Sequence, residues 1–66
     1  MHLIMHTYRG YNGTATPDED EGWHGRVTLP EDVVTFVHRD VNKLQAEFET
    51  SVDVYLDFVA EQEAKA

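Results

Sequence analysis

The chain contains no cysteine, and its shortness makes that absence important. Without cysteine, no disulfide can stabilise a fold of 66 residues. A chain of this length buries only about 60% of the surface that it exposes when unfolded. A structural zinc site would depend on four histidines that lack the paired spacing of zinc ligands, namely His2, His6, His24 and His38. We therefore expect one small domain over residues 1–66, with no metal and no cofactor, stabilised as a homodimer or larger homo-oligomer.

Basic residues are also scarce, which leaves the chain strongly acidic. Thirteen Asp and Glu residues against five Lys and Arg residues give a formal net charge of -8. This charge opposes direct binding to nucleic acid or to an anionic membrane, because both need clustered Lys and Arg. It favours a basic protein partner, drawn in by long-range attraction, although acidity also keeps small proteins soluble.

Long apolar runs are missing as well. Residues 1–6 carry an apolar run too short for a signal peptide, and no basic residue flanks it. No stretch of the sequence approaches the roughly 20 apolar residues of a membrane span. We expect a cytoplasmic protein.

The first half of the sequence is typical of β-strands. Residues 8–16 are rich in Tyr and Thr and predict a first strand, with residues 1–7 as an extension of uncertain structure. Asn12-Gly13 is also a strong hairpin signal, so a competing interpretation places a tight turn there and a strand over residues 3–8.

Two turns separate the later strands. Residues 17–22 and 30–32 combine proline with acidic residues or glycine. Residues 23–29 predict a second strand, in which alternate side chains point to opposite faces of a sheet. One face receives Trp23, Gly25, Val27 and Leu29, and the other receives His24, Arg26 and Thr28. Residues 33–38 are dense in β-branched and aromatic residues. Residues 8–38 therefore predict a three-stranded antiparallel meander.

The period becomes helical after Asp40, whose carboxylate suits an N-cap. Apolar residues then step by three and four along one stripe: Val41, Leu44, Phe48, Val52, Tyr55 and Val59. We predict one long amphipathic helix over residues 40–63, packed on one face of the sheet, and hence an α+β fold of order β-β-β-α. Val54 interrupts the polar side of this helix and is either an ordinary exposed valine or part of a self-association surface.

Acidic residues form two groups. One is the turn of Asp18, Glu19, Asp20 and Glu21. The other is a ridge along the helix, where Glu49, Asp53 and Asp57 follow one another at intervals of four and repel by a few tenths of a kcal/mol each. Such a ridge without neighbouring lysines is either a solvated face or a surface for a basic partner.

No constellation in the sequence predicts catalysis. Ser51, the only serine, has no histidine within a helical turn to activate it. The acids of residues 18–21 are adjacent and splay apart, so they do not converge on a metal ion as hydrolysis requires. They also lack the bidentate glutamate of a calcium loop. Trp23, beside this turn, is a core residue or, if exposed, an interface anchor. We expect a protein that is not an enzyme.

Four segments, taken in order, resemble one known family. They are residues 8–13 (YRGYNG), 24–27 (HGRV), 32–36 (DVVTF) and 51–58 (SVDVYLDF). Together they resemble the N-terminal domain of HicB-type antitoxins over about residues 8–59. The resemblance implies a partial ribonuclease H-like fold, oligomers, and tight binding to a small basic toxin that cleaves RNA. The sequence ends soon after the expected helix, before the further strand and the DNA-binding domain that such antitoxins often carry, and Val54 stands where they commonly have an acid.

The expected function is therefore inhibition by binding. The two acidic groups would face Lys and Arg on the toxin, with Trp23 adding apolar contact, and the toxin's RNA site would be covered. A second interpretation is a phage-encoded inhibitor, such as an anti-CRISPR protein, that mimics nucleic-acid charge on the basic groove of a defence complex. A third, residual ribonuclease H-like activity, would need convergent magnesium-binding acids.

Overall fold

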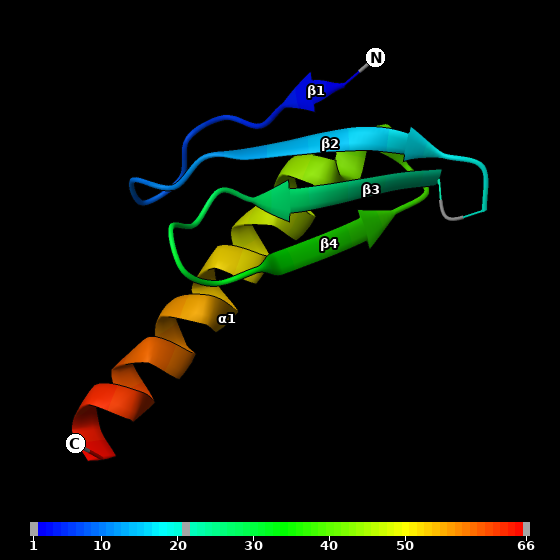
Figure 1. The fold of residues 1–66 in the computed structure, drawn as a ribbon. Coiled ribbons are helices and arrows are strands. Elements are labelled where there is room, and N and C mark those ends of the chain that lie inside the picture. The colour runs from blue at the N-terminus through cyan, green and yellow to red at the C-terminus, as the bar shows by residue number, and fades with distance from the viewer. Residues whose placement is uncertain (1, 21, 66) are drawn as a thin grey trace.

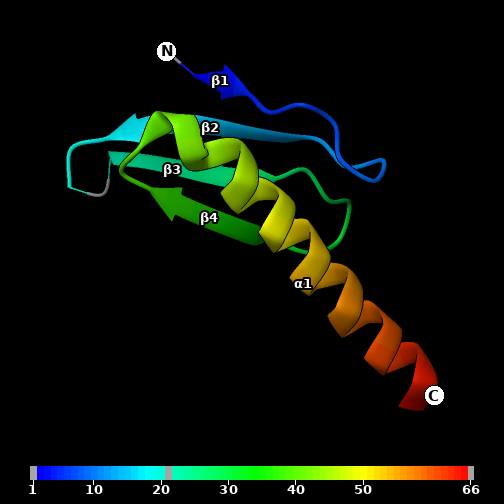
Figure 2. The same cartoon turned by 180° about the vertical axis from the view of Figure 1, so that it is seen from behind.

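The computed structural model describes residues 2–20 and 22–65. Within these residues, four strands form one antiparallel sheet in the order β1-β2-β3-β4, followed by a short 3-10 helix and a single long α-helix. The elements are β1 (Leu3–Ile4), β2 (Gly13–Asp18), β3 (Gly22–Val27), β4 (Val34–His38), η1 (Val41–Lys43) and α1 (Leu44–Lys65). Helix α1 lies across one face of the sheet and continues past its end, while the other face is left uncovered (Figures 1 and 2).

The α+β class, the antiparallel sheet and the C-terminal helix were expected, but the expected number of strands, three, was wrong. The additional strand β1 pairs Leu3 with Ala15 and Ile4 with Thr14. The first strand was also wrong at its start, because β2 begins at Gly13 rather than at residue 8. The competing interpretation was right to place a strand within residues 3–8.

The tight turn between β1 and β2 lies at Arg9-Gly10 and not at Asn12-Gly13. Tyr8 and Tyr11 exchange two backbone hydrogen bonds of 3.0 and 2.9 Å across it. Arg9 has φ 52° and Gly10 has φ 85°, the positive values that hairpin turns of two residues require. Gly13 instead leaves room for helix α1, because a Cβ atom at this position would overlap the ring of Phe48.

The turn between β2 and β3 is shorter than the predicted turn of residues 17–22. Pro17 and Asp18 belong to β2 and pair with Trp23 and Gly22. Pro17, which has no N–H to donate, is tolerated because β1 pairs with β2 only as far as Ala15. At the tip, the Asp20 N–H donates to the Asp18 carboxylate over 2.8 Å.

Strand β3 has the predicted alternation. Gly25 and Val27 are buried under the helix, whereas His24 and Arg26 are exposed on the uncovered face. The ring of Phe36, which is the cross-strand partner of Gly25, occupies the space where a Cβ atom of residue 25 would lie.

The core lies between the sheet and the first half of α1. Its buried residues are Met5, Ala15, Val27, Phe36, Leu44, Phe48 and Val52. Phe48 is fully buried, and its ring centroid lies 5.8 Å from that of Phe36. None of residues 55–64 of α1 is buried, because the 22 residues of the helix span about 33 Å and a strand of six residues only about 17 Å.

The helix begins close to the predicted point. The Asp40 carboxylate accepts from the Asn42 N–H over 2.9 Å, so its N-cap role is confirmed, although the first turn is the 3-10 helix η1. Val41 was expected in the buried stripe but is 43% exposed. None of the described helices has the length and the apolarity needed to cross a membrane.

The contact between Gly25 and Phe36 predicts a large effect for a single methyl group. We expect Gly25→Ala to destabilise the fold by about 1–3 kcal/mol, because the Phe36 ring must leave a well-packed position. Urea unfolding followed by circular dichroism measures this, with Thr14→Ala on the uncovered face as the control. A loss below about 0.5 kcal/mol, the usual range for surface changes, would contradict the packing described.

Candidate functional site

The tight turn at Arg9-Gly10 binds the middle of the acidic ridge. The Arg9 guanidinium donates to the Asp53 carboxylate over 2.9 Å, and the Tyr8 hydroxyl donates to both oxygens of the same carboxylate, over 3.0 and 3.1 Å. The side chains of Arg9 and Asp53 remain 53% and 45% exposed. Asp53 therefore holds the N-terminal segment against α1 while part of its carboxylate still faces solvent.

A second attachment lies two helical turns earlier. The His6 N–H donates to the side-chain oxygen of Gln45 over 2.8 Å, and the Gln45 amide donates back to the His6 carbonyl over 3.1 Å. The same amide donates to the Glu49 carboxylate over 3.0 Å. Gln45 thus satisfies both backbone groups of His6, as a neighbouring strand would. We call the side of α1 that carries Gln45, Glu49, Asp53 and Asp57 the acidic flank.

These contacts alter the protonation of the groups at the turn. The hydrogen bond from Tyr8 to Asp53, together with burial and the negative charge of Asp53, raises the pKa of the Tyr8 phenol above its ordinary value. The same carboxylate raises the pKa of Arg9. Both effects favour the forms in which Tyr8 is neutral and Arg9 is charged, which are the forms that hold Asp53.

The opposite side of α1 is anchored by Tyr55. Its hydroxyl donates to the Asp32 carboxylate over 3.0 Å, and that hydrogen bond raises the pKa of the Tyr55 phenol. The rings of Tyr11 and Tyr55 meet edge to face with centroids 6.1 Å apart. Tyr55 therefore joins the helix to two connecting segments, one that precedes β2 and one that precedes β4.

The structure does not bring the predicted partner-binding acids together. Asp18, Glu19 and Asp20 lie at the hairpin between β2 and β3, and Glu21 lies outside the described residues. Glu49, Asp53 and Asp57 lie on the acidic flank, where Asp53 meets the turn at the other end of the sheet. The length of β2, about 17 Å, separates the hairpin from that turn (Figure 1).

Trp23 is half-buried and packs against the core on the helix side of the sheet. It is the cross-strand partner of both Pro17 and His38. The structure therefore gives Trp23 a packing role, and its contact with a partner stays a prediction, as does that of every acid named above.

Ion pairs offset little of the negative charge in the described part of the chain. Among residues 2–20 and 22–65, Arg9–Asp53 is the one ion pair present. Other acids accept hydrogen bonds from neutral groups: Glu49 from Gln45, Asp32 from Tyr55 and Asp40 from Asn42. A neutral donor leaves the carboxylate charge in place, so the surface stays strongly negative.

Neither metal-binding nor nucleophilic groups cluster in the described part of the chain. No three of its His, Asp and Glu residues approach one another closely enough to hold a metal ion. Ser51 lies beside the apolar residues of α1. His38 accepts a hydrogen bond from the Asp40 N–H over 2.9 Å.

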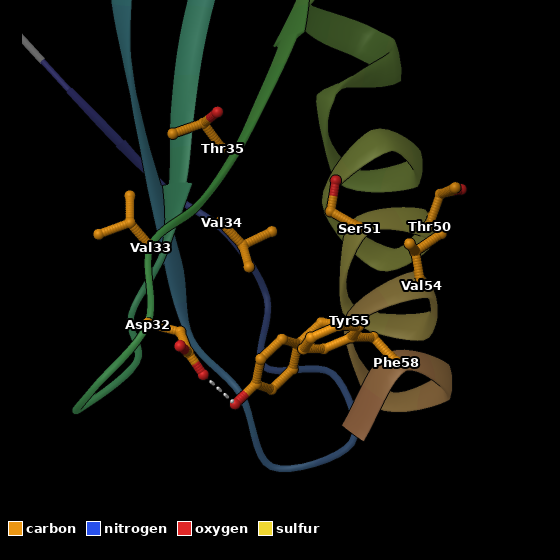
Figure 3. Close-up of a pocket in the computed structure, with 9 residues that line it drawn as sticks. All are labelled: Asp32, Val33, Val34, Thr35, Thr50, Ser51, Val54, Tyr55 and Phe58. Carbon is orange, nitrogen blue, oxygen red and sulfur yellow. Dashed lines mark hydrogen bonds between the residues drawn. The ribbon is translucent and has the colours of Figure 1, made fainter. Parts of the chain in front are cut away.

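A surface that the sequence reasoning largely missed lies between β4 and α1. This groove of about 450 Å³ includes the exposed Val54 together with Val33 and Phe58. In Figure 3, Val34 points from the strand toward the helix, Ser51 and Tyr55 point back, and Tyr55 reaches Asp32. We call it the β4 groove. Of its residues, the sequence had singled out Val54 alone as a possible self-association surface, because Val33 and Val34 lie about 20 residues before it along the chain.

Comparison of this chain with models of known protein families, with curated proteins and with solved structures finds no match. The chain's own residues and the resemblance of its motifs are therefore the basis for inferring its function.

The hydrogen bonds of Tyr8 and Tyr55 to carboxylates predict that the stability of the fold depends on pH. Because the folded state raises the pKa of Tyr8 and Tyr55, it holds both phenol protons more tightly than the unfolded chain does. This contribution to stability is complete below pH about 10 and is lost as the pH rises through the folded values. We expect Asp53→Ala to lower the pKa of Tyr8 toward the ordinary value and to speed amide exchange at Tyr8 and Tyr11.

Tyrosine ring signals in an NMR titration measure these pKa values. The matched control is Asp57→Ala, one turn further along the acidic flank, which should leave Tyr8 unchanged because no hydrogen bond joins the two. If the pKa of Tyr8 were the same in Asp53→Ala as in the wild type, the hydrogen bond from Tyr8 to Asp53 would be refuted.

Proposed function

We propose that this protein is a non-enzymatic inhibitor that binds a small basic, RNA-cleaving toxin and covers its active surface, in the manner of a HicB-type antitoxin. The action is occlusion and involves no chemical step. The observation that carries the proposal is the excess of negative charge: a formal net charge of -8, with Arg9–Asp53 as the ion pair formed within the described part of the chain.

The arrangement of the acids suits an extended contact. The hairpin carries exposed carboxylates at one end of the sheet, and the acidic flank carries Asp53 and Asp57 toward the other end. A partner that contacts both must present basic residues over about 17 Å. Such complementarity raises the rate of encounter and selects the partner more than it tightens the final complex.

The rigidity of the acidic flank supports the same proposal. Asp53 is oriented by Tyr8 and Arg9, and Glu49 is oriented by Gln45. Side chains that are already ordered lose less conformational freedom when they bind, so more of the interaction energy remains as affinity. In this proposal Arg9 has a positioning role, since it fixes the carboxylate that the partner meets.

The resemblance of the motifs indicates the class of partner. The described α+β arrangement, an antiparallel sheet followed by one C-terminal helix, agrees at that coarse level with the fold that the resemblance implies. The ribonuclease identity of the partner rests on the resemblance, and its basic character rests on the charge.

Co-expression and a purified assay test the proposal together. Small basic proteins encoded next to the gene of this chain are expressed with and without it, and cleavage of a labelled RNA is followed. We expect one of them to cleave RNA and arrest growth, and this chain to abolish both effects at a stoichiometric ratio. Cleavage that continues with this chain in excess would refute the proposal.

Charge reversal distinguishes a specific contribution of the hairpin acids to association from the effect of net charge alone. The variant Glu19→Lys with Asp20→Lys should slow association with the toxin by about tenfold or more at low salt, because it reverses the steering field at the contact. The control, Glu61→Lys with Glu63→Lys, makes the same change in net charge at the projecting end of α1. Equal slowing by both pairs, or association that does not depend on salt, would contradict a specific hairpin contact.

A further inference from the structure

The β4 groove gathers half of the large apolar side chains that are exposed in the described part of the chain. Among the described residues, six large apolar side chains are exposed, and three of them line this groove: Val33 at 74%, Val54 at 63% and Phe58 at 54%. Its other apolar walls are Val34 and the ring of Tyr55. Apolar side chains gathered in this way mark an interaction surface, whereas single ones do not.

The groove borders an unprotected sheet edge. Strand β4 is the last in the order β1-β2-β3-β4, so within the described residues no strand covers its outer side. The residues of β4, VTFVH, include neither lysine nor proline, two of the means by which edge strands avoid pairing. The other edge strand, β1, has only two residues and offers a poor template.

We propose that a second copy of this chain occupies the β4 groove, with the two β4 strands pairing antiparallel across a two-fold axis. The sheet then continues through both copies, and the Val54 and Phe58 sides of the two α1 helices approach each other. This inference concerns assembly and does not depend on the proposed function.

Charge favours a second copy over other occupants. Glu31 and Asp32 precede β4, and Arg39 follows its last residue, His38, so an antiparallel pair places the acids before each strand near Arg39 of the other. Asp32 is the one charged residue that lines the groove, and it accepts the Tyr55 hydroxyl. Glu49 and Asp53 of the acidic flank face away from the groove, and Glu47 and Glu61, which lie one heptad either side of Val54 on α1, are the acids nearest to the proposed two-fold axis.

The exposed area also indicates a missing neighbour. A compact monomer of 7.6 kDa exposes about 4,300 Å² by the usual scaling of area with mass. This chain exposes 4903 Å². The excess of about 600 Å² approaches the roughly 800 Å² that each partner buries in a stable interface. Part of the excess is the end of α1 that projects past the sheet (Figure 2).

Sedimentation equilibrium over a wide range of concentration tests this proposal. We expect a mass of twice 7.6 kDa for the wild type. Val54→Glu should raise the dimer Kd by about a hundredfold or more, because two unpaired carboxylates would be buried at the interface. The control, Ile4→Glu, changes a side chain that is 75% exposed at the far edge of the sheet, and it should leave the Kd unchanged.

A charge exchange tests the pairing without altering the apolar surface. Arg39→Glu should raise the dimer Kd by about tenfold, and adding Glu31→Arg should restore it, because the two charges meet only across the two-fold axis. A monomeric wild type, a dimer insensitive to Val54→Glu, or no rescue by the double exchange would each overturn the proposal. A monomer whose groove takes up only the toxin would overturn it in favour of that occupant.

Discussion

The packing of two aromatic rings against two glycines determines how closely the helix and the sheet approach each other. Phe48 on α1 lies over Gly13, and Phe36 on β4 lies over Gly25. Because both glycines lack a Cβ atom, the helix can approach the sheet closely enough to bury Phe48 completely. With only seven buried apolar residues in the described core, a small domain has few other sources of stability. The docking of one helix on one sheet is therefore its central constraint.

That docking divides the helix surface into three sides. The buried side carries Leu44, Phe48 and Val52. The flank toward β1 carries the acids, and Tyr8, Arg9 and the His6 backbone hold it in place. The flank toward β4 carries Val54 and Phe58 beside an uncovered sheet edge. One side would stabilise the fold, one would meet a basic partner, and one would meet a second copy, so the two proposed contacts do not compete for the same surface.

The features that could be predicted from the sequence are those set by local periodicity. The alternation of Trp23 to Val27 predicted the correct faces of β3, and the spacing by four of Leu44, Phe48 and Val52 predicted the buried side of α1. Asp40 was the correct cap. A strand of two residues, β1, is too short to alternate, so the sequence offered it only in the competing interpretation, and its pairing with Ala15 and Thr14 establishes it. The competing interpretation placed a turn at Asn12-Gly13 because that pair favours positive φ. Tertiary packing instead required Gly13 beneath Phe48, and Arg9 accepted the positive φ.

The candidate surfaces depended even more on tertiary structure. The interval of four predicted that Glu49, Asp53 and Asp57 share one flank, but no local pattern shows that Arg9, 44 residues before Asp53, would pair with it. Val54 stood out as an apolar residue among acids. Its assignment to a groove with Val33 depends on β4 being the edge of the sheet.

Amide hydrogen exchange along the whole chain, measured free and with the basic partner bound, tests the division of surfaces most directly. The account predicts that β4 amides exchange slowly in the free protein at concentrations where it self-associates, and that the partner slows exchange at the hairpin after Asp18 and along residues 6–11. Protection by the partner that falls on β4 and leaves the hairpin and the N-terminal turn unchanged would contradict it.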